Sequence, residues 1–430
     1  MVLPKSNRGN LNNVLVSISA AHVGSRQSFG RALNMPIRRL KIGYFILEGS
    51  NSFASVYYAY YLYFFMEKAF GFGNKANLTL AACYGGIYTV AAWLGGRVSQ
   101  RIGYLSALKL GFATMAGGLI IGSQVSSATA QIGVMALIVI GMCLTWPSLE
   151  ALVSDGEGPA TLPRMIGIYN VVWAGTGALS YFVGGAMLDR LGLKSMFYVP
   201  LAIELAQLAF CFWLQAKVHA AEVRTSQADS NQLVATPLLP DLNPRPIAKA
   251  RAFLRMAWLA NPFAYIAINT LIAVMPALSA RLGLSTTLAG FCGSVWCFSR
   301  LGAFFLLWFW EGWHYRFRWM MVAYVGLLAT FAAILAAPNL AALVAAQLVF
   351  GAAVGLIYYS SLFYSMDTSE AKGEHGGIHE AAIGLGNFAG PAMGAASLHF
   401  LPDYANSGVL AVTGLLAAGL AGLVAIRKWG

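Results

Sequence analysis

The chain has 430 residues, of which 58% are hydrophobic and only 10% are charged, and its net charge is +12 with a mean hydropathy of +0.64. A soluble protein carries about 25% charged residues, so this chain has too few to cover a water-facing surface. The composition excludes a soluble enzyme or binding domain, and it predicts a membrane protein that crosses the bilayer many times.

The N-terminal segment, residues 1–41, carries seven lysines and arginines and no acidic residue, and we expect it to be disordered. An Arg- and Ser-rich segment without acids suits an organelle transit peptide. The interpretation we prefer is a natural start at Met35, with the preceding residues as an extension. No apolar core with a cleavage site precedes Met35, so we do not expect a cleaved secretory signal.

Apolar runs of about 20 residues can cross the hydrocarbon layer of a bilayer as helices. The sequence contains twelve such runs: 42–66, 78–98, 104–123, 131–153, 165–188, 195–216, 256–280, 287–310, 318–337, 340–365, 376–400 and 407–427. The polar segment 217–255, rich in Pro, Ser and Asn, separates the first six from the last six and has the composition of a flexible linker. The sequence thus predicts an all-α membrane protein with two six-helix pseudo-repeats, bundles 42–216 and 256–430, as in duplicated transporters.

The positive charges lie mainly on one side of the predicted helices. If both termini are cytoplasmic, the cytoplasmic segments hold 22 of the 28 lysines and arginines, as the positive-inside rule requires. The others are Lys68, Lys75, Arg190, Lys194 and Arg281 in outer loops, and Arg300 within a helix. The basic loops face anionic lipid headgroups, so the net charge implies no nucleic-acid partner. A bacterial inner membrane with both termini inside is the expected location.

Three motifs resemble those of the major facilitator superfamily. The segment GGRVSQRIGYLSALKLG, residues 95–111, resembles the loop between helices 2 and 3, with Gln100 in the usual acidic position. Residues 184–205 resemble the junction of helices 5 and 6, and GNFAGPAMG, residues 386–394, resembles helix 11. The resemblance covers about residues 40–428. It implies a twelve-helix transporter fold and does not identify a substrate.

Polar residues inside membrane helices are costly and mark functional sites. Arg300 lies about ten residues, roughly 15 Å, from the cytoplasmic end of helix 8, near the midplane where such transporters bind substrate. We predict that Arg300 contacts the substrate or the coupling machinery; a structural ion pair with a neighbouring helix is the alternative. The other predicted substrate-binding residues, each with packing as its alternative, are Glu48, Asn51, Tyr58, Trp146, Asn170, Trp173, Asn269, Tyr358 and Tyr359.

Buried carboxyl groups are the predicted sites of proton coupling or gating. Glu48 lies about two turns into helix 1 and could load and release a proton, or it could be a hydrogen-bonded packing residue. Glu150 lies about one turn from the cytoplasmic end of helix 4, where a gate salt bridge is the preferred role. We assign no role to Glu204 in helix 6.

The segment KGEHGGIHE, residues 372–380, places His375, His379 and Glu380 close together before helix 11. Two histidines four residues apart share a helix face, and with a carboxylate they could bind zinc. The intervening glycines predict a loop around His375, which weakens that geometry. We therefore expect a solvated helix cap, with a proton-coupling or gating role as the alternative, and no metal site.

These features together predict a secondary active transporter of a small organic solute, which works by alternating access and is coupled to protons as a symporter or antiporter. The predicted cavity residues suit a polar or anionic solute, either imported or exported. No Walker-type GxxxxGK[ST] motif occurs in the chain. We expect a monomer that contacts membrane lipids, without cofactor or enzymatic activity. A receptor or assembly factor on the same scaffold, or a lipid translocase, is the alternative.

Overall fold

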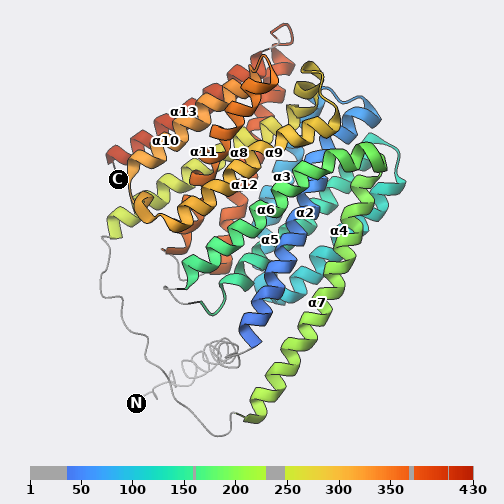
Figure 1. The fold of residues 1–430 in the computed structure, drawn as a ribbon, viewed down its shortest axis with the longest axis vertical. Helices are drawn as coiled ribbons and strands as arrows, with labels where there is room; N and C mark the ends of the chain where they lie inside the picture. Colours follow the sequence, from blue (N-terminus) through green and yellow to red (C-terminus); the bar gives the residue numbers. More distant parts are fainter. Residues whose placement is uncertain (1–35, 158–160, 229–246, 368–371, 405, 430) are drawn as a thin grey trace, which may run out of the picture. The chain divides into compact units, whose positions relative to one another are not determined.

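The computed structural model of the chain describes residues 36–157, 161–228, 247–367, 372–404 and 406–429 (Figure 1). Within these residues the protein is entirely helical, with twelve long α-helices, one short 3-10 helix and no strand. The predicted all-α architecture of twelve helices is confirmed. The first 35 residues, with the preferred start at Met35, lie outside the described part of the chain.

The helices keep the labels of Figure 1. They are α2 (Pro36–Phe70), α3 (Asn74–Ile102), α4 (Tyr104–Gln124), α5 (Ala128–Ser154), α6 (Leu162–Leu191), α7 (Ser195–Ala228), α8 (Ile247–Arg281), α9 (Thr286–Phe309), η1 (Glu311–Trp313), α10 (Phe317–Leu335), α11 (Leu340–Asp367), α12 (Lys372–Phe400) and α13 (Ser407–Trp429).

Ten of the twelve described α-helices are long and apolar enough to span a membrane, and α2 and α12 are the two that are not among them. Both helices are long enough, with 35 and 29 residues. Their polar side chains include Glu48 in α2 and His379 and Glu380 in α12. Both helices thus carry predicted functional residues, as do several of the ten apolar ones.

At three places helix extends further than the apolar runs. Helix α2 begins at Pro36, within the segment expected to be disordered. Helix α7 continues to Ala228 and α8 begins at Ile247, so both flanks of the expected linker at 217–255 are helical. These flanks are rich in Ala, Lys, Arg and Glu, which favour helix outside a membrane as well as within it. Residues 229–246 lie outside the description.

The chain divides into two compact units. The smaller comprises residues 1–43 and 212–240, and its described part consists of the start of α2 and the second half of α7. The larger comprises residues 44–211 and 241–430 and contains all the residues of the site described below.

Within the larger unit, two helix pairs join the first six helices to the last six. Helix α3 packs along α12, and α6 packs along α9. In each pair, the second helix of one half meets the fifth helix of the other, which is the pattern that two equivalent repeats produce. Both contacts depend on glycine: a Cβ atom at Gly85 would overlap the α12 backbone at Asn387, and one at Gly185 would overlap the carbonyl oxygen of Thr286. Small residues allow such close approach of backbones in membrane proteins.

Candidate functional site

A cavity of about 150 Å³ lies within the larger unit. Its lining comes from eight helices, four of the first six (α2, α3, α5, α6) and four of the last six (α8, α9, α11, α12). A cavity of this volume holds on the order of ten water molecules, or a small organic molecule in their place. Both halves of the protein therefore contribute equally to one internal site.

The lining is aromatic, with only two charged side chains. Of its 22 residues, eleven are tyrosine or tryptophan, and the charged residues are Arg300 and Glu380. Tyr and Trp rings offer flat apolar faces together with polar edges. Such a lining suits a planar or partly polar solute better than a flexible hydrocarbon chain.

The predicted substrate-binding residues fall into two groups. Five of them line the cavity: Trp146, Trp173, Asn269, Arg300 and Tyr358. The other five are buried in helix packing and are not among the lining residues: Glu48, Asn51, Tyr58, Asn170 and Tyr359. Tyr58, for example, packs against Phe197 with ring centroids 6.4 Å apart. The binding roles of all ten residues remain predictions.

Several lining residues were missed from the sequence, among them the tyrosine pair of α3. Tyr84 and Tyr88 are four residues apart and stack with ring centroids 6.0 Å apart. Their spacing places them on one face of the helix, and this signal was available in the sequence. Aromatic side chains at this spacing in an apolar helix usually belong to core packing, so the spacing alone does not identify a binding site.

Arg300 lies between two indole rings at the cavity wall. Its Cζ atom is 4.3 Å from the ring centroid of Trp173 and 4.8 Å from that of Trp296. The side chain is 6% exposed, and its Nε atom has no hydrogen-bond partner among the described residues. Among the described residues, no carboxylate forms an ion pair with Arg300. Cation–π contact thus holds the guanidinium group without neutralising it.

Two amide side chains in the cavity lining are hydrogen-bonded to each other. The Nδ2 atom of Asn269 on α8 donates to the Oδ1 atom of Asn387 on α12 at 2.5 Å, and it also donates to the carbonyl oxygen of Tyr265. Both amides line the cavity. The pairing leaves a carbonyl oxygen on Asn269 and an amino group on Asn387, so the wall offers one acceptor and one donor to a solute.

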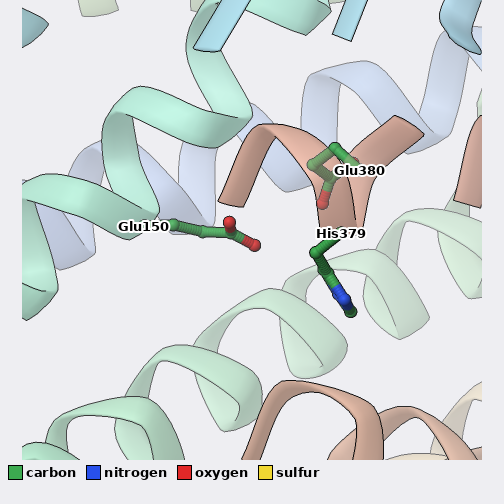
Figure 2. Close-up of side chains that lie close together, drawn as sticks. All are labelled: Glu150, His379 and Glu380. Atoms are coloured by element: carbon green, nitrogen blue, oxygen red, sulfur yellow. The ribbon is translucent and has the colours of Figure 1, made fainter. Parts of the chain in front are cut away.

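Carboxyl groups from three helices gather at one side of the site. Glu150 of α5 and Glu380 of α12 lie with His379 so that one potential ligand atom of each is within 4.8 Å of the others. Figure 2 shows the Glu150 side chain directed toward the α12 residues. Glu48 of α2, which is fully buried, is within electrostatic reach of both glutamates. Of these four side chains, only that of Glu380 is among the residues that line the cavity.

The expectation of a solvated cap in this region was wrong for the residues that the structure describes. Helix α12 begins at Lys372, so the expected loop around His375 is helical, although the side chain of His375 lies outside the description. His379 and Glu380 are only 2% and 5% exposed. Glycine is tolerated within a helix that is buried against neighbours, at a cost of about 1 kcal/mol each, and packing against α3 overrides the local preference.

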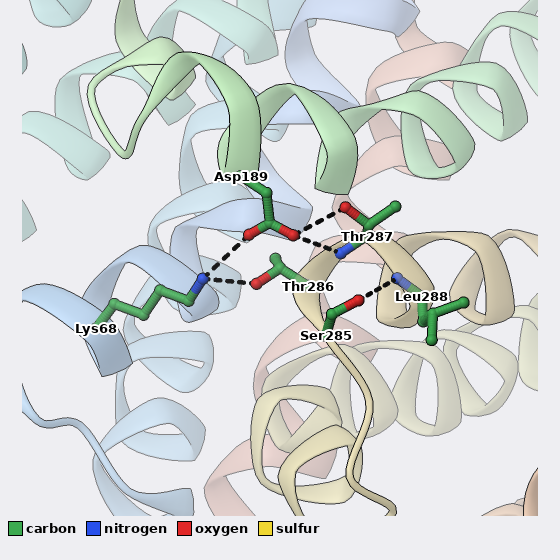
Figure 3. A network of polar contacts seen from close by, with 6 residues as sticks. All are labelled: Lys68, Asp189, Ser285, Thr286, Thr287 and Leu288. Carbon is green, nitrogen blue, oxygen red and sulfur yellow. Dashed lines mark hydrogen bonds and ion pairs between the residues drawn. The ribbon is translucent and has the colours of Figure 1, made fainter.

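A second polar cluster joins α2, α6 and α9 near helix ends (Figure 3). The Nζ atom of Lys68 lies 3.4 Å from Asp189 Oδ1 and donates to the hydroxyl of Thr286 at 2.5 Å. Asp189 Oδ2 accepts hydrogen bonds from the backbone N–H and the hydroxyl of Thr287, at 2.9 and 2.8 Å. Asp189 therefore caps the N-terminus of α9 from a different helix, where a negative charge is favourable.

The fold and the site can now be compared with known proteins. The family model described as Major Facilitator Superfamily matches residues 42–391, so the chain belongs to that superfamily of transporters. It is an integral membrane protein that crosses the bilayer several times.

Solved structures show the same fold. The nucleoside transporter NupG is similar with a TM-score of 0.64 and 16% identity, covering 91% of this chain and 100% of that one. Its D323A mutant gives a TM-score of 0.65 and 14% identity, covering 90% and 99%. The human organic anion transporter MFSD10 (TETRAN) gives 0.61 and 16%, covering 90% and 99%. No curated protein sequence matches significantly.

Proposed function

We propose that the protein is a secondary active transporter of a small organic solute, which works by alternating access and is driven by protons. The observation that carries this proposal is the cavity of about 150 Å³, lined by four helices from each half. When two halves share a central site, rocking of one half against the other exposes the site to one side at a time.

The solute is polar or anionic and has a planar part. Arg300 supports this assignment, because a guanidinium group without a carboxylate partner is available to a carboxylate or phosphate of the solute. The aromatic lining and the amide pair of Asn269 and Asn387 add stacking surfaces and hydrogen-bonding groups. Two structures of similar fold belong to a nucleoside transporter and an organic anion transporter, and both kinds of solute fit this description.

Glu48 is the proposed proton carrier. It is fully buried in α2 and lies beside Tyr169 of α6. Glu150 of α5 and Glu380 of α12 act on it electrostatically. Mutual repulsion of buried carboxylates favours a state in which some of them carry protons. A change in the surroundings of Glu48 when the halves rock would then take up or release a proton.

A binding screen followed by transport measurements tests this function. Purified protein is first heated with a library of nucleosides and organic anions, because a ligand of the folded state raises its melting temperature. The ligands found are then supplied to proteoliposomes with and without a pH gradient. Concentrative uptake that depends on the gradient is the expected result. Binding without any flux would indicate a receptor instead, and flux only of lipids would indicate a translocase.

A further inference from the structure

We propose that Glu150, His379 and Glu380 form a binding site for one divalent transition-metal ion. The cluster combines two carboxylates and one imidazole. Among the described residues, these three side chains lie close enough together to hold a metal ion. Carboxylate oxygen and imidazole nitrogen together suit Mn²⁺, Fe²⁺, Co²⁺ and Zn²⁺. This inference concerns an ion and does not depend on which organic solute the protein moves.

The first argument is the unused hydrogen-bonding capacity of the cluster. Glu150 is 5% exposed, and neither of its carboxyl oxygens accepts a hydrogen bond from an N–H or hydroxyl group of a described residue. Its polar neighbour is the carboxyl group of Glu380. The Nε2 atom of His379 is also buried and without a partner. Buried polar atoms are nearly always satisfied, so such atoms call for a bound ion or water. Figure 2 shows the carboxyl group of Glu150 directed toward the α12 residues His379 and Glu380.

The second argument is that neighbouring residues orient two of the three ligands. The hydroxyl of Ser361 on α11 lies 3.4 Å from the Nδ1 atom of His379, and the Nε2 atom has no hydrogen-bond partner among the described residues. The hydroxyl of Tyr88 on α3 donates to Glu380 Oε2. Metal-binding histidines and carboxylates usually have such second partners, which fix the ligand atoms in place.

The third argument is the balance of buried charge around the cavity. Glu48, Glu150 and Glu380 are three buried carboxyl groups, and Arg300 is the buried cation of the same region. When all three are ionised, as after Glu48 has released its proton, the four groups have a net charge of −2, which one divalent cation would balance. An uncompensated charge at membrane depth is expensive, so an ion of this charge makes the site neutral without protons.

The geometry fits after a small closure. Ligand atoms around tetrahedral zinc lie about 3.4 Å apart, given bonds of about 2.1 Å, whereas here they lie within 4.8 Å of one another. Rotation of the two long glutamate side chains covers this difference without backbone movement. Since Glu380 also lines the cavity, the remaining coordination position faces the cavity, where water or an anionic group of the solute can complete it.

Metal binding to tag-free, full-length protein in detergent tests the site. The protein is stripped with a chelator and titrated separately with Zn²⁺, Mn²⁺ and Co²⁺, by calorimetry and, for Co²⁺, by its visible absorption. We expect one ion per chain, with a Co²⁺ spectrum of nitrogen and oxygen ligands. Glu150→Gln, His379→Ala and Glu380→Gln should each weaken binding by at least about tenfold, and Ser361→Ala by about tenfold through loss of the orienting contact.

The matched control is Glu204→Gln, which neutralises a buried carboxyl group on α7 that is outside the cluster. It should change metal affinity less than about twofold. The melting temperature of each variant, measured with chelator present, shows whether the variant is folded. The Co²⁺ spectrum of the unmodified protein tests the site without any substitution. Absence of stoichiometric binding overturns the proposal. Binding that persists in all three ligand variants also overturns it, because the ion then lies elsewhere.

Discussion

Two polar clusters link helices of the larger unit, and they differ in one respect. In the network of Lys68, Asp189, Thr286 and Thr287, polar groups find protein partners, and the charged side chains are partly exposed. In the cluster of Glu150, His379 and Glu380, the side chains are buried and several atoms have no donor or acceptor. In the first network, contacts within the protein satisfy the polar groups. In the second cluster, a bound ion, proton or solute is needed to satisfy them.

Typical energies support this distinction. An exposed ion pair contributes roughly 0–1 kcal/mol to stability, and a side chain that caps a helix contributes about 1 kcal/mol. A buried polar group without a partner costs about 1–3 kcal/mol, and more when it is charged. A protein retains such a cost where ligand binding or proton transfer compensates for it. Substitutions in the two clusters should therefore affect different properties, stability in the network and ion or solute binding in the cluster.

The largest expected effect is in cysteine labelling, which should be complete at one position and absent at another. It tests whether the network of Lys68 and Asp189 lies on the outer side of the membrane. From the charge distribution, the loop after Asp189 should be outside and the polar segment between the halves inside. In a background without the exposed Cys83, a membrane-impermeant thiol reagent added to intact cells should label Lys194→Cys and not Ser230→Cys. Ser230 itself lies outside the described residues. Labelling of Ser230→Cys from outside would overturn the orientation and the comparison built on it.

Loss of energy coupling is the next largest effect. Glu48→Gln keeps the size of the side chain and removes its ability to carry a proton, so uphill transport driven by a pH gradient should disappear. Counterflow exchange should survive, because it needs no net proton movement. Glu204→Gln is the control, because Glu204 is also a buried carboxyl group but is not part of the cluster of Glu150, His379 and Glu380. This variant should keep coupled transport. Undiminished uphill transport by Glu48→Gln would move the coupling site to Glu150.

The sequence predicted the fold better than it predicted the site. A long apolar run predicts a membrane helix, and each of the twelve predicted runs falls on an observed helix. The site depends on which face of each helix meets the others, and α5 shows the limit: Trp146 lines the cavity, whereas Glu150, one turn further, does not. The meeting of Glu150 with His379 joins helices more than 200 residues apart. No local pattern contains such a contact, so the carboxyl cluster could not be derived from spacing alone.

A change in solute affinity should follow from Arg300→Lys. The substitution keeps the charge and loses the planar fork that binds a carboxylate or phosphate at two points. It also loses much of the stacking between Trp173 and Trp296. Affinity should fall by at least about tenfold, which is about 1.4 kcal/mol.

Arg281→Lys is the matched control for that change, because Arg281 is the last residue of α8, is not among the cavity-lining residues, and donates to the carbonyl oxygens of Leu335 and Ala337. It should leave solute affinity unchanged. A lowered melting temperature of Arg300→Lys with unchanged affinity would assign Arg300 a structural role.

The smallest expected effect is on the network itself. Asp189→Asn removes the ion pair with Lys68 and weakens the cap on α9, while the amide oxygen can still accept from the Thr287 N–H. Because Lys68 and Asp189 are 39% and 31% exposed, solvent screens their attraction, and the loss should be at most about 1 kcal/mol. Lys68→Gln should cost a similar amount, and the double variant should cost less than the two single effects together, since both remove the same pair. The part of the loss in stability that comes from the ion pair should shrink as salt is added.

A loss of several kcal/mol, or a change in metal affinity with Asp189→Asn, would show that the two clusters are not independent. A small and salt-sensitive loss would confine the role of the network to holding α2, α6 and α9 together.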